Sequence, residues 1–327
     1  MTTEIWSISA ESSAAGEPSP STAQFEAALV CAEEALRVDG RSVEALHNRA
    51  LALQELGQLD LARDSFTRAL AIEPDDPETL AGAADLYINR LTPSAELSEI
   101  GVEYAHRGSQ QLRRGAAGPP ASVKDSIKDS GKDSIRAKAR ARDRDRDPGA
   151  RALLGRLLLL EAQGLNDLGR PQEALQRLDA AIAASDSVQA RYERAMALLD
   201  LCRFGQARRA FSEVVQREPS DAWAHYNLGL TLEMLGLQAA ADKELAQAQK
   251  LAPRDFPEPL PITREQFRAL VDKEVQALTP EQRADLQQVS LETADLPALA
   301  DLTAEEPPLA PTILGLFRGL PLPAAAP

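Results

Sequence analysis

Three stretches of the sequence align with one another without a gap, and this repetition constrains the fold more than any other feature. They begin at Val43, Val188 and Ala222, and the last two begin 34 residues apart. A period of this size is typical of a solenoid, in which each repeat packs only on its neighbours. The sequence therefore predicts an all-α array of stacked helix pairs.

Each copy has the pattern of two amphipathic helices with a break between them. A small residue in the first helix allows close approach, and an alanine in the second helix stands four residues before a large apolar residue on the same face. A proline ends each copy, because it lacks an N–H group and cannot continue a helix. For each copy the residues are, in turn, the small residue of the first helix, the break, the alanine and the large residue of the second helix, and the final proline: Ala50, Gly57, Ala62, Phe66, Pro74; Ala195, Cys202, Ala207, Phe211, Pro219; and Gly229, Gly236, Ala241, Leu245, Pro253.

This pattern resembles the tetratricopeptide repeat in its length, its alanine and phenylalanine pair and its terminal proline. The resemblance covers most of residues 22–253. It implies a superhelical solenoid of helix-turn-helix units whose first helices line a concave, peptide-binding surface. The matched ranges are 43–76, 188–221 and 222–253 in full, 77–113 and 155–187 in part, and a half copy at 22–39.

A charged stretch of low complexity interrupts the repeats. It contains Lys-Asp-Ser three times and then alternates Arg and Asp, so we expect a flexible tether. The alternative is a basic patch for nucleic acid or an acidic partner, but the aspartates cancel most of the positive charge. The expected divisions are a disordered N-terminus at 1–21, repeat block one at 22–114, a disordered charged linker at 115–149, repeat block two at 150–253, and an incomplete α+β segment with a tail at 254–327.

We expect the two blocks to stack into one superhelix across this linker. An apolar face in the repeat at 155–187 needs a neighbour, and the helix expected at 95–113 could cover it. Loop closure over such a linker costs little, because the entropy grows only logarithmically with length. The face consists of Leu153, Leu157, Leu160 and Leu165.

Charge and cysteine usage exclude several classes of partner. The formal net charge of −14 argues against binding to nucleic acid or to an anionic membrane. Cys31 and Cys202 are far apart, so we expect two buried, reduced thiols and a cytoplasmic protein. No secretory signal and no apolar stretch long enough to span a bilayer occurs in the sequence. A protein or peptide is the expected partner, and the sequence does not indicate an oligomeric state.

No motif for catalysis or cofactor binding is present. His47, His106 and His225 have neither a second histidine four residues away nor a nearby cysteine, so no metal site is expected. Neither a phosphate-binding glycine loop nor a serine nucleophile elbow occurs. We therefore expect no cofactor.

The first helices of the second block carry a candidate binding surface. Aromatic residues make up only 4% of the chain, yet two tyrosines and a tryptophan lie at helical spacing here. Aromatic anchors with a polar tip suit peptide recognition, although packing on a neighbouring helix is the alternative, above all for Trp223. In the resembling family, grooves that clamp a C-terminal carboxylate use Lys and Asn; Asn48 and Asn227 are in place, but the lysines are missing. The predicted groove residues are His47, Gln189, Tyr192, Met196, Trp223, Tyr226, Asn227 and Leu230.

Two helices and two strands are expected after the repeats. Thr263 stands at an N-cap position before one helix, and Thr279 and Pro280 open a second. The alternating "VSLETAD" and the apolar "TILGLFRG" predict strands at 289–295 and 312–319.

The same segment resembles the N-terminal half of the minimal zincin-like metallopeptidases over residues 256–323. "REQFRALVDKEVQALTPEQRADLQQVSLETAD" and, most specifically, "ILGLFRGLPL" carry this resemblance. In that family a zinc-binding helix with the pattern H-E-x-x-H follows, and here no histidine lies beyond His225. The resemblance implies a segment without its catalytic half. The alternative is that residues 313–319 form a hydrophobic plug that packs on the repeats.

Two functions from different classes remain. The first is a non-enzymatic scaffold that binds peptide segments in the concave groove of its repeats. The second is a zinc metallopeptidase fused to a repeat array, truncated or degenerate because its catalytic helix is missing from this chain. The absent zinc-binding helix favours the scaffold.

Overall fold

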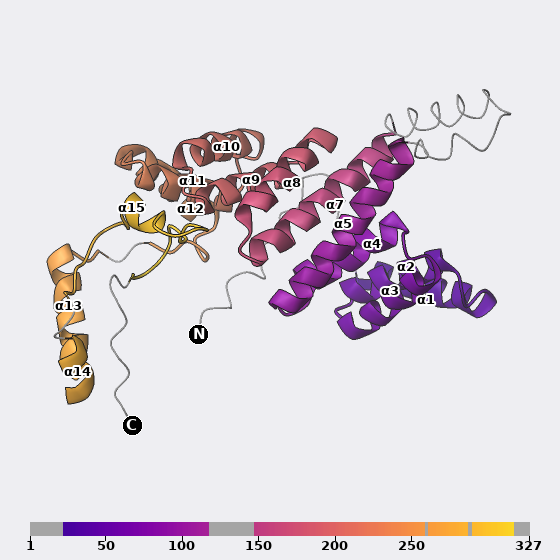
Figure 1. Ribbon diagram of the computed structural model, residues 1–327, viewed down its shortest axis with the longest axis horizontal. Coiled ribbons are helices and arrows are strands. Elements are labelled where there is room, and N and C mark those ends of the chain that lie inside the picture. Colours follow the sequence, from indigo (N-terminus) through magenta and orange to yellow (C-terminus); the bar gives the residue numbers. More distant parts are fainter. Residues whose placement is uncertain (1–21, 118–146, 259–260, 287–289, 317–327) are drawn as a thin grey trace, which may run out of the picture.

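The computed structural model describes residues 22–117, 147–258, 261–286 and 290–316, and within these ranges it is built from helices without a strand (Figure 1). Consecutive helices pack in antiparallel pairs, and each pair packs on the next, so the predicted all-α solenoid is confirmed. The helices of the first block are α1 (Thr22–Val38), α2 (Val43–Glu55), α3 (Leu59–Ile72), α4 (Pro77–Asp85), the π-helix η1 (Leu86–Arg90) and α5 (Ala95–Ala117). Those that follow are α7 (Pro148–Asp167), α8 (Pro171–Ala184), α9 (Val188–Asp200), α10 (Phe204–Arg217), α11 (Ala222–Met234), α12 (Gln238–Leu251), α13 (Arg264–Ala277), α14 (Pro280–Leu286) and α15 (Leu299–Leu302).

The first helix of most pairs begins at a side-chain cap. The capping oxygen accepts a hydrogen bond from the backbone N–H three residues further on, which satisfies one of the free donors of the first turn. Such caps fix where each pair starts along the chain. The capping residues are Ser42, Asp76, Ser187 and Asp221, at the starts of α2, α4, α9 and α11.

The turn inside four of the described helix pairs has a left-handed backbone conformation. Gly57, Gly169 and Gly236 have φ angles of 72°, 68° and 71°, and Cys202 takes the same role with φ 55°. Glycine adopts this conformation without strain, whereas a Cβ costs on the order of 1 kcal/mol. Three glycines and one strained cysteine therefore occupy equivalent turns.

Two glycines of the second block should respond to alanine with opposite signs. Gly236→Ala should lower the free energy of unfolding by about 1 kcal/mol, because φ is positive and no neighbour lies within 4 Å to add a steric effect. Gly205→Ala, in the first turn of α10 and equally uncrowded, should raise it by about 0.5 kcal/mol through helix propensity. Urea denaturation measures both, and equal effects would contradict the turn argument.

The alanine and phenylalanine pairs predicted from the repeat form the interior. Ala62, Phe66, Ala207 and Phe211 are all buried. Each phenylalanine packs between two first helices; at Gly82 of α4, a Cβ atom would lie only 2.7 Å from the ring of Phe66. Small residues on the first helices thus make room for the large ones on the second.

The two blocks pack on each other through α5 and α7, which confirms the expected docking (Figure 1). Ala105 and Leu157 are buried there, and a Cβ at Gly108 would lie 2.8 Å from Leu157. The linker was predicted at 115–149, but α5 extends to Ala117 and α7 begins at Pro148, so the helices reach further than expected. The expected disorder at 118–146 and at 1–21 lies outside the described residues.

A buried carboxylate joins three helices at this junction. Glu161 of α7 is only 2% exposed, and its Oε1 lies 2.9 Å from both His106 Nδ1 of α5 and Arg177 Nε of α8. A buried acid is stable only when it is paired, so this cluster fixes how the blocks meet. Sequence reasoning did not find this role for His106.

Removing this carboxylate should destabilise the whole array. Glu161→Ala should lower the free energy of unfolding by about 3 kcal/mol, because it removes the ion-pair partner of Arg177 and the hydrogen-bond partner of His106 and leaves a small cavity. Glu213→Ala removes the exposed partner of Arg191, 2.9 Å away, and should cost less than about 1 kcal/mol. Urea denaturation at neutral pH compares the two, and a similar cost for both would contradict the clamp.

The segment after the repeats keeps its predicted helices but not its strands. Thr263 and Gln266 form a capping box at the start of α13, and α14 begins at Pro280 as expected. Neither helix buries a residue, and Phe267 of α13 is half-exposed. The predicted strands do not form over 290–295 and 312–316, because the described chain offers them no strand edge to pair with; 289 and 317–319 lie outside the described residues.

One cysteine differs from expectation. Cys202 is buried as predicted, but Cys31 lies on the exposed face of α1. Most of α1 is open to solvent, with only Ala32 buried, because α1 has a single neighbouring helix, α2, among the described residues. A helix packed on one side buries only one stripe.

Candidate functional site

The first helices α9 and α11 lie side by side and bring two predicted groove residues into contact. Asn227 Nδ2 donates a hydrogen bond of 2.9 Å to Tyr192 Oη. The Tyr192 ring packs edge-on against Phe211, with ring centroids 6.0 Å apart. Burial raises the pKa of the Tyr192 hydroxyl, so it remains a neutral hydrogen-bonding group.

Three aromatic rings form a cluster at the N-terminal half of α11. Phe256, which follows α12, stacks on Tyr226 at a centroid distance of 4.7 Å and meets Trp223 edge-on at 4.8 Å. Phe256 is buried, whereas Trp223 remains 38% exposed. The packing alternative therefore accounts for much of Tyr226, while Trp223 keeps an open face. Phe256 was missed, because it lies outside the repeat pattern.

The remaining predicted residues are divided between the two blocks. Gln189 is exposed, and Met196 and Leu230 are half-buried. His47 lies on α2 in the first block, edge-on to Phe66 at a centroid distance of 6.0 Å, and does not join the others. Burial lowers the pKa of its imidazole, which suits a packed neutral ring.

Three carboxylates that the sequence analysis did not single out, Glu193, Asp200 and Asp167, influence one another beside the predicted groove. Partial desolvation raises the pKa of Asp200 on α9 to about 6, and the negative charge of Glu193, two turns earlier on the same helix, raises it further. Desolvation, and then Glu193, raise the pKa of Asp167 on α7 to about 6 as well. Burial raises the pKa of Glu193 itself, although Gln163 Nε2 donates to its Oε1 at 2.8 Å. This surface is therefore acidic and poorly hydrated.

The raised pKa of Asp200 predicts a pH-dependent stability. Between pH 3.8 and about 6, Asp200 is protonated in the folded protein but ionised in the unfolded chain. Its unfavourable effect on folding therefore grows through this window and is complete above about pH 6. Asp200→Asn should therefore raise the free energy of unfolding by about 1–2 kcal/mol at pH 7.5, with the gain shrinking as the pH falls toward 4.

Urea denaturation at pH 7.5 and 4.5 measures this effect. Glu26→Gln removes an exposed carboxylate on α1 and serves as the control, which should change little at either pH. A destabilising Asp200→Asn at pH 7.5 would contradict the desolvation of this group.

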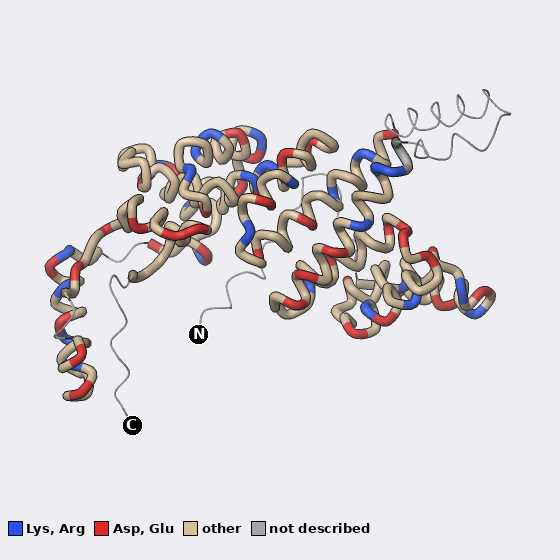
Figure 2. The backbone as a smooth tube through the Cα atoms, in the orientation of Figure 1, with Lys and Arg blue, Asp and Glu red and all other residues tan. Residues whose placement is uncertain are grey.

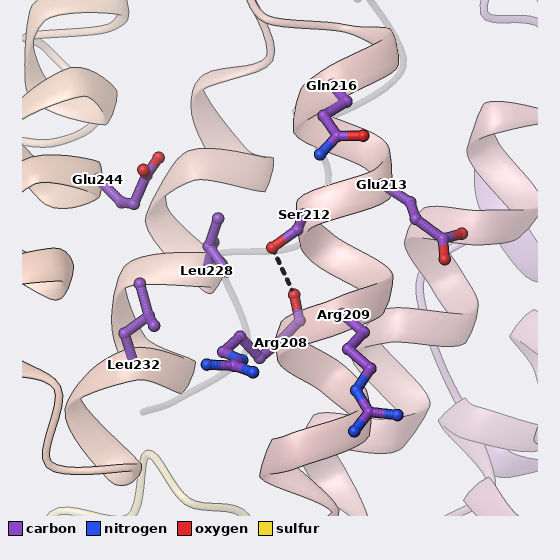
Figure 3. A pocket seen from close by; sticks show the side chains of 8 residues that line it. All are labelled: Arg208, Arg209, Ser212, Glu213, Gln216, Leu228, Leu232 and Glu244. Carbon is purple, nitrogen blue, oxygen red and sulfur yellow. Dashed lines mark hydrogen bonds between the residues drawn. The ribbon is translucent and has the colours of Figure 1, made fainter.

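An open hollow of about 420 Å³ lies between α10, α11 and α12 (Figure 3). Ser212 Oγ donates to the carbonyl oxygen of Arg208 along α10, and Glu244 lies across the hollow on α12. None of the eight predicted groove residues lines it. The lining consists of Arg208, Arg209, Ser212, Glu213, Gln216, Leu228, Leu232 and Glu244.

The third histidine, His225, has both of its ring nitrogens within hydrogen-bonding distance of an oxygen of the repeats. His225 is buried on α11; its Nδ1 lies 2.6 Å from Glu244 Oε2 and its Nε2 lies 3.1 Å from the carbonyl oxygen of Pro219. These contacts tie α11 to α12 and to the preceding turn. Over the part of the chain that the structure describes, no group of three or more His, Cys, Asp and Glu side chains is placed to hold a metal ion. None of the described helices is both long and apolar enough to cross a membrane.

Comparison with known proteins identifies the repeats. The tetratricopeptide repeat family matches at residues 43–76 and again at 192–256. No curated protein matches the chain.

Solved structures share the fold at low identity. The structure of pilF from Pseudomonas aeruginosa is 14% identical, with a TM-score of 0.52 over 76% of this chain and 90% of that one. PilW, described as a widely conserved type IV pilus biogenesis factor, is 19% identical, with a TM-score of 0.52 over 76% and 91%. YrrB, described as a TPR protein with an unusual peptide-binding site, is 18% identical, with a TM-score of 0.47 over 69% and 95%. At these identities the likeness to pilF and PilW concerns the fold alone, and residues 43–76 and 192–256 of this chain match the tetratricopeptide repeat.

Proposed function

We propose that this chain is a non-enzymatic scaffold that binds a peptide segment of a partner protein in the groove of α9 and α11. Tetratricopeptide-repeat proteins are generally protein-interaction scaffolds, and stacked repeats create extended concave surfaces for binding. The carrying observation is that α9 and α11 gather a polar pair, Tyr192 and Asn227, beside the partly open ring of Trp223.

These side chains suit an extended peptide. Trp223 offers a rigid apolar face that loses little conformational entropy on binding. The amide of Asn227 and the hydroxyl of Tyr192 offer hydrogen bonds in a partly desolvated place, where they count for more than in water. Gln189, exposed one turn before Glu193, lies at the rim of the same surface.

The proposal also covers the absence of catalysis, the location of the protein, the classes of partner and the division of the chain. The repeats provide binding rather than catalysis. A cytoplasmic location is part of the proposal, because both cysteines are free thiols. Basic and acidic residues are interspersed along the helices (Figure 2). The net charge of −14 disfavours nucleic acid and anionic membranes as partners. The division into two repeat blocks joined by a charged linker also belongs to the proposal.

A peptide selected for binding tests the groove. A random peptide library is selected on the wild-type protein, and the dissociation constant of the best peptide is measured by fluorescence anisotropy. Trp223→Ala should weaken binding at least about 10-fold, and Tyr192→Phe, which removes the hydroxyl that accepts from Asn227, about 3–5-fold.

A matched control separates the groove from the general surface. Leu237→Ala truncates another exposed apolar side chain of the same block, 42% exposed in the turn before α12, and should leave the dissociation constant unchanged. Selected peptides that bind equally well to Trp223→Ala would place the binding surface elsewhere.

A further inference from the structure

We propose that residues 299–313 are an intramolecular ligand of the repeats, which covers part of the groove face and is displaced when a partner peptide binds. This inference rests on the proposed function, because it assumes that the partner uses the same surface. It goes beyond that function by assigning a role to the segment that follows the repeats.

The first anchor of this segment is Leu302. It lies at the end of α15, a helix of four residues, which is far too short to be stable by itself. Yet Leu302 is 0% exposed and belongs to the buried apolar cluster formed by residues of α8 to α12. Figure 1 shows α15, in yellow, against this block of the array. The repeats therefore provide the burial that orders α15.

Two further anchors follow within the same segment. Leu309 and Ile313 are half-buried and pack against the same cluster. The N–H of Leu309 donates to the carbonyl oxygen of Leu302 at 2.8 Å, which closes the intervening loop and places the leucines together. The Cys202 thiol points at the carbonyl oxygen of Leu309, 3.7 Å away, at the turn between α9 and α10. The segment is thus seated on the repeats at defined points.

The segment packs against the same apolar cluster as part of the predicted groove. Tyr192 and Met196, both predicted groove residues, pack against the cluster that buries Leu302. A partner peptide that bound to this part of α9 would have to displace Leu309 or Ile313. Competition between the segment and the partner follows from this shared cluster.

The segment is held weakly enough to be displaced. Between its anchors, residues 303–307 are exposed, and immediately after them Leu314 is fully exposed. The helices α13 and α14, which connect it to the repeats, bury no residue. A tether of this length gives an effective concentration on the order of mM, so a few anchors keep the site covered without locking it.

The anchors also describe the chemistry of the competing partner. Leu302 comes from a single helical turn, and Leu309, Pro311 and Ile313 come from a stretch that reads Leu-Ala-Pro-Thr-Ile and turns at 310–313, where the N–H of Ile313 donates to the carbonyl oxygen of Ala310 at 3.2 Å. A partner peptide that combines a leucine in a helical turn with a proline-containing apolar stretch would use the same contacts. This is a peptide class rather than a nucleic acid or a lipid.

A labelled peptide with the sequence of residues 298–316 tests the proposal. It is titrated by fluorescence anisotropy into the full-length wild type, the Leu302→Asp variant and the Leu314→Asp variant. Leu302→Asp should free the site and bind the peptide at least about 10-fold tighter than the wild type, since no tethered competitor remains. Leu314→Asp makes the same change at an exposed position and should bind like the wild type.

The thiol of Cys202 provides an independent readout of release. In a Cys31→Ser background, its reaction with a thiol reagent should be at least about 10-fold faster in Leu302→Asp than in Leu314→Asp, because exposure governs thiol reactivity. Circular dichroism checks that each variant is folded. If Leu302→Asp is unfolded, Ile313→Asp, at a half-buried anchor, replaces it in both measurements.

The outcomes separate this inference from the proposed function. Equal peptide affinity in all three proteins, or no binding to a folded released variant, would overturn the intramolecular ligand. A library-selected peptide that depends on Trp223 but binds wild type and Leu302→Asp equally would leave the groove function intact and refute only the displacement.

Discussion

The close approach of neighbouring helices at small residues is the constraint on which the rest of this structure depends. A repeat array has no central core, so each helix pair must bury its apolar face on the next pair. Contact at this distance leaves no room for side chains on both partners, as the glycines facing Phe66, Leu157 and Leu245 show. This packing sets successive first helices beside one another, and the long side chains of Tyr192 on α9 and Asn227 on α11 meet in a hydrogen bond.

Most of the array could be predicted from sequence because its determinants are local and repeated. The alanine and phenylalanine pair of one copy, Ala62 and Phe66, predicts the burial of its counterparts. The serine or aspartate before a first helix and the glycine inside a pair set boundaries within a few residues of the place they act. The same pattern of small, large and turn residues recurs in every copy, so the solenoid could be predicted even where a copy matches the pattern only in part.

The rest depends on residues far apart in the chain, and no local pattern reports it. Glu161 lies within the partial repeat at 155–187, and its partners come from α5 and α8. The desolvated carboxylates gain their raised pKa from helices stacked around them, and Phe256 reaches Tyr226 from beyond the last repeat. The two predicted strands failed for the converse reason: an apolar run becomes a strand only beside another strand, and Ile313 found helices instead. The alternative of a plug packed on the repeats comes closer to what Ile313 does.

The packing of α5 on α7 implies that the two halves of the array depend on each other for stability even if the chain between them is cut. If residues 22–117 and 147–316 were produced as two polypeptides, the same side-chain contacts would have to hold them together without a connecting chain. Folding would then become a bimolecular reaction, and the melting temperature of the pair would rise with protein concentration. The difference between that pair and the intact chain would measure the local concentration that chain connectivity supplies.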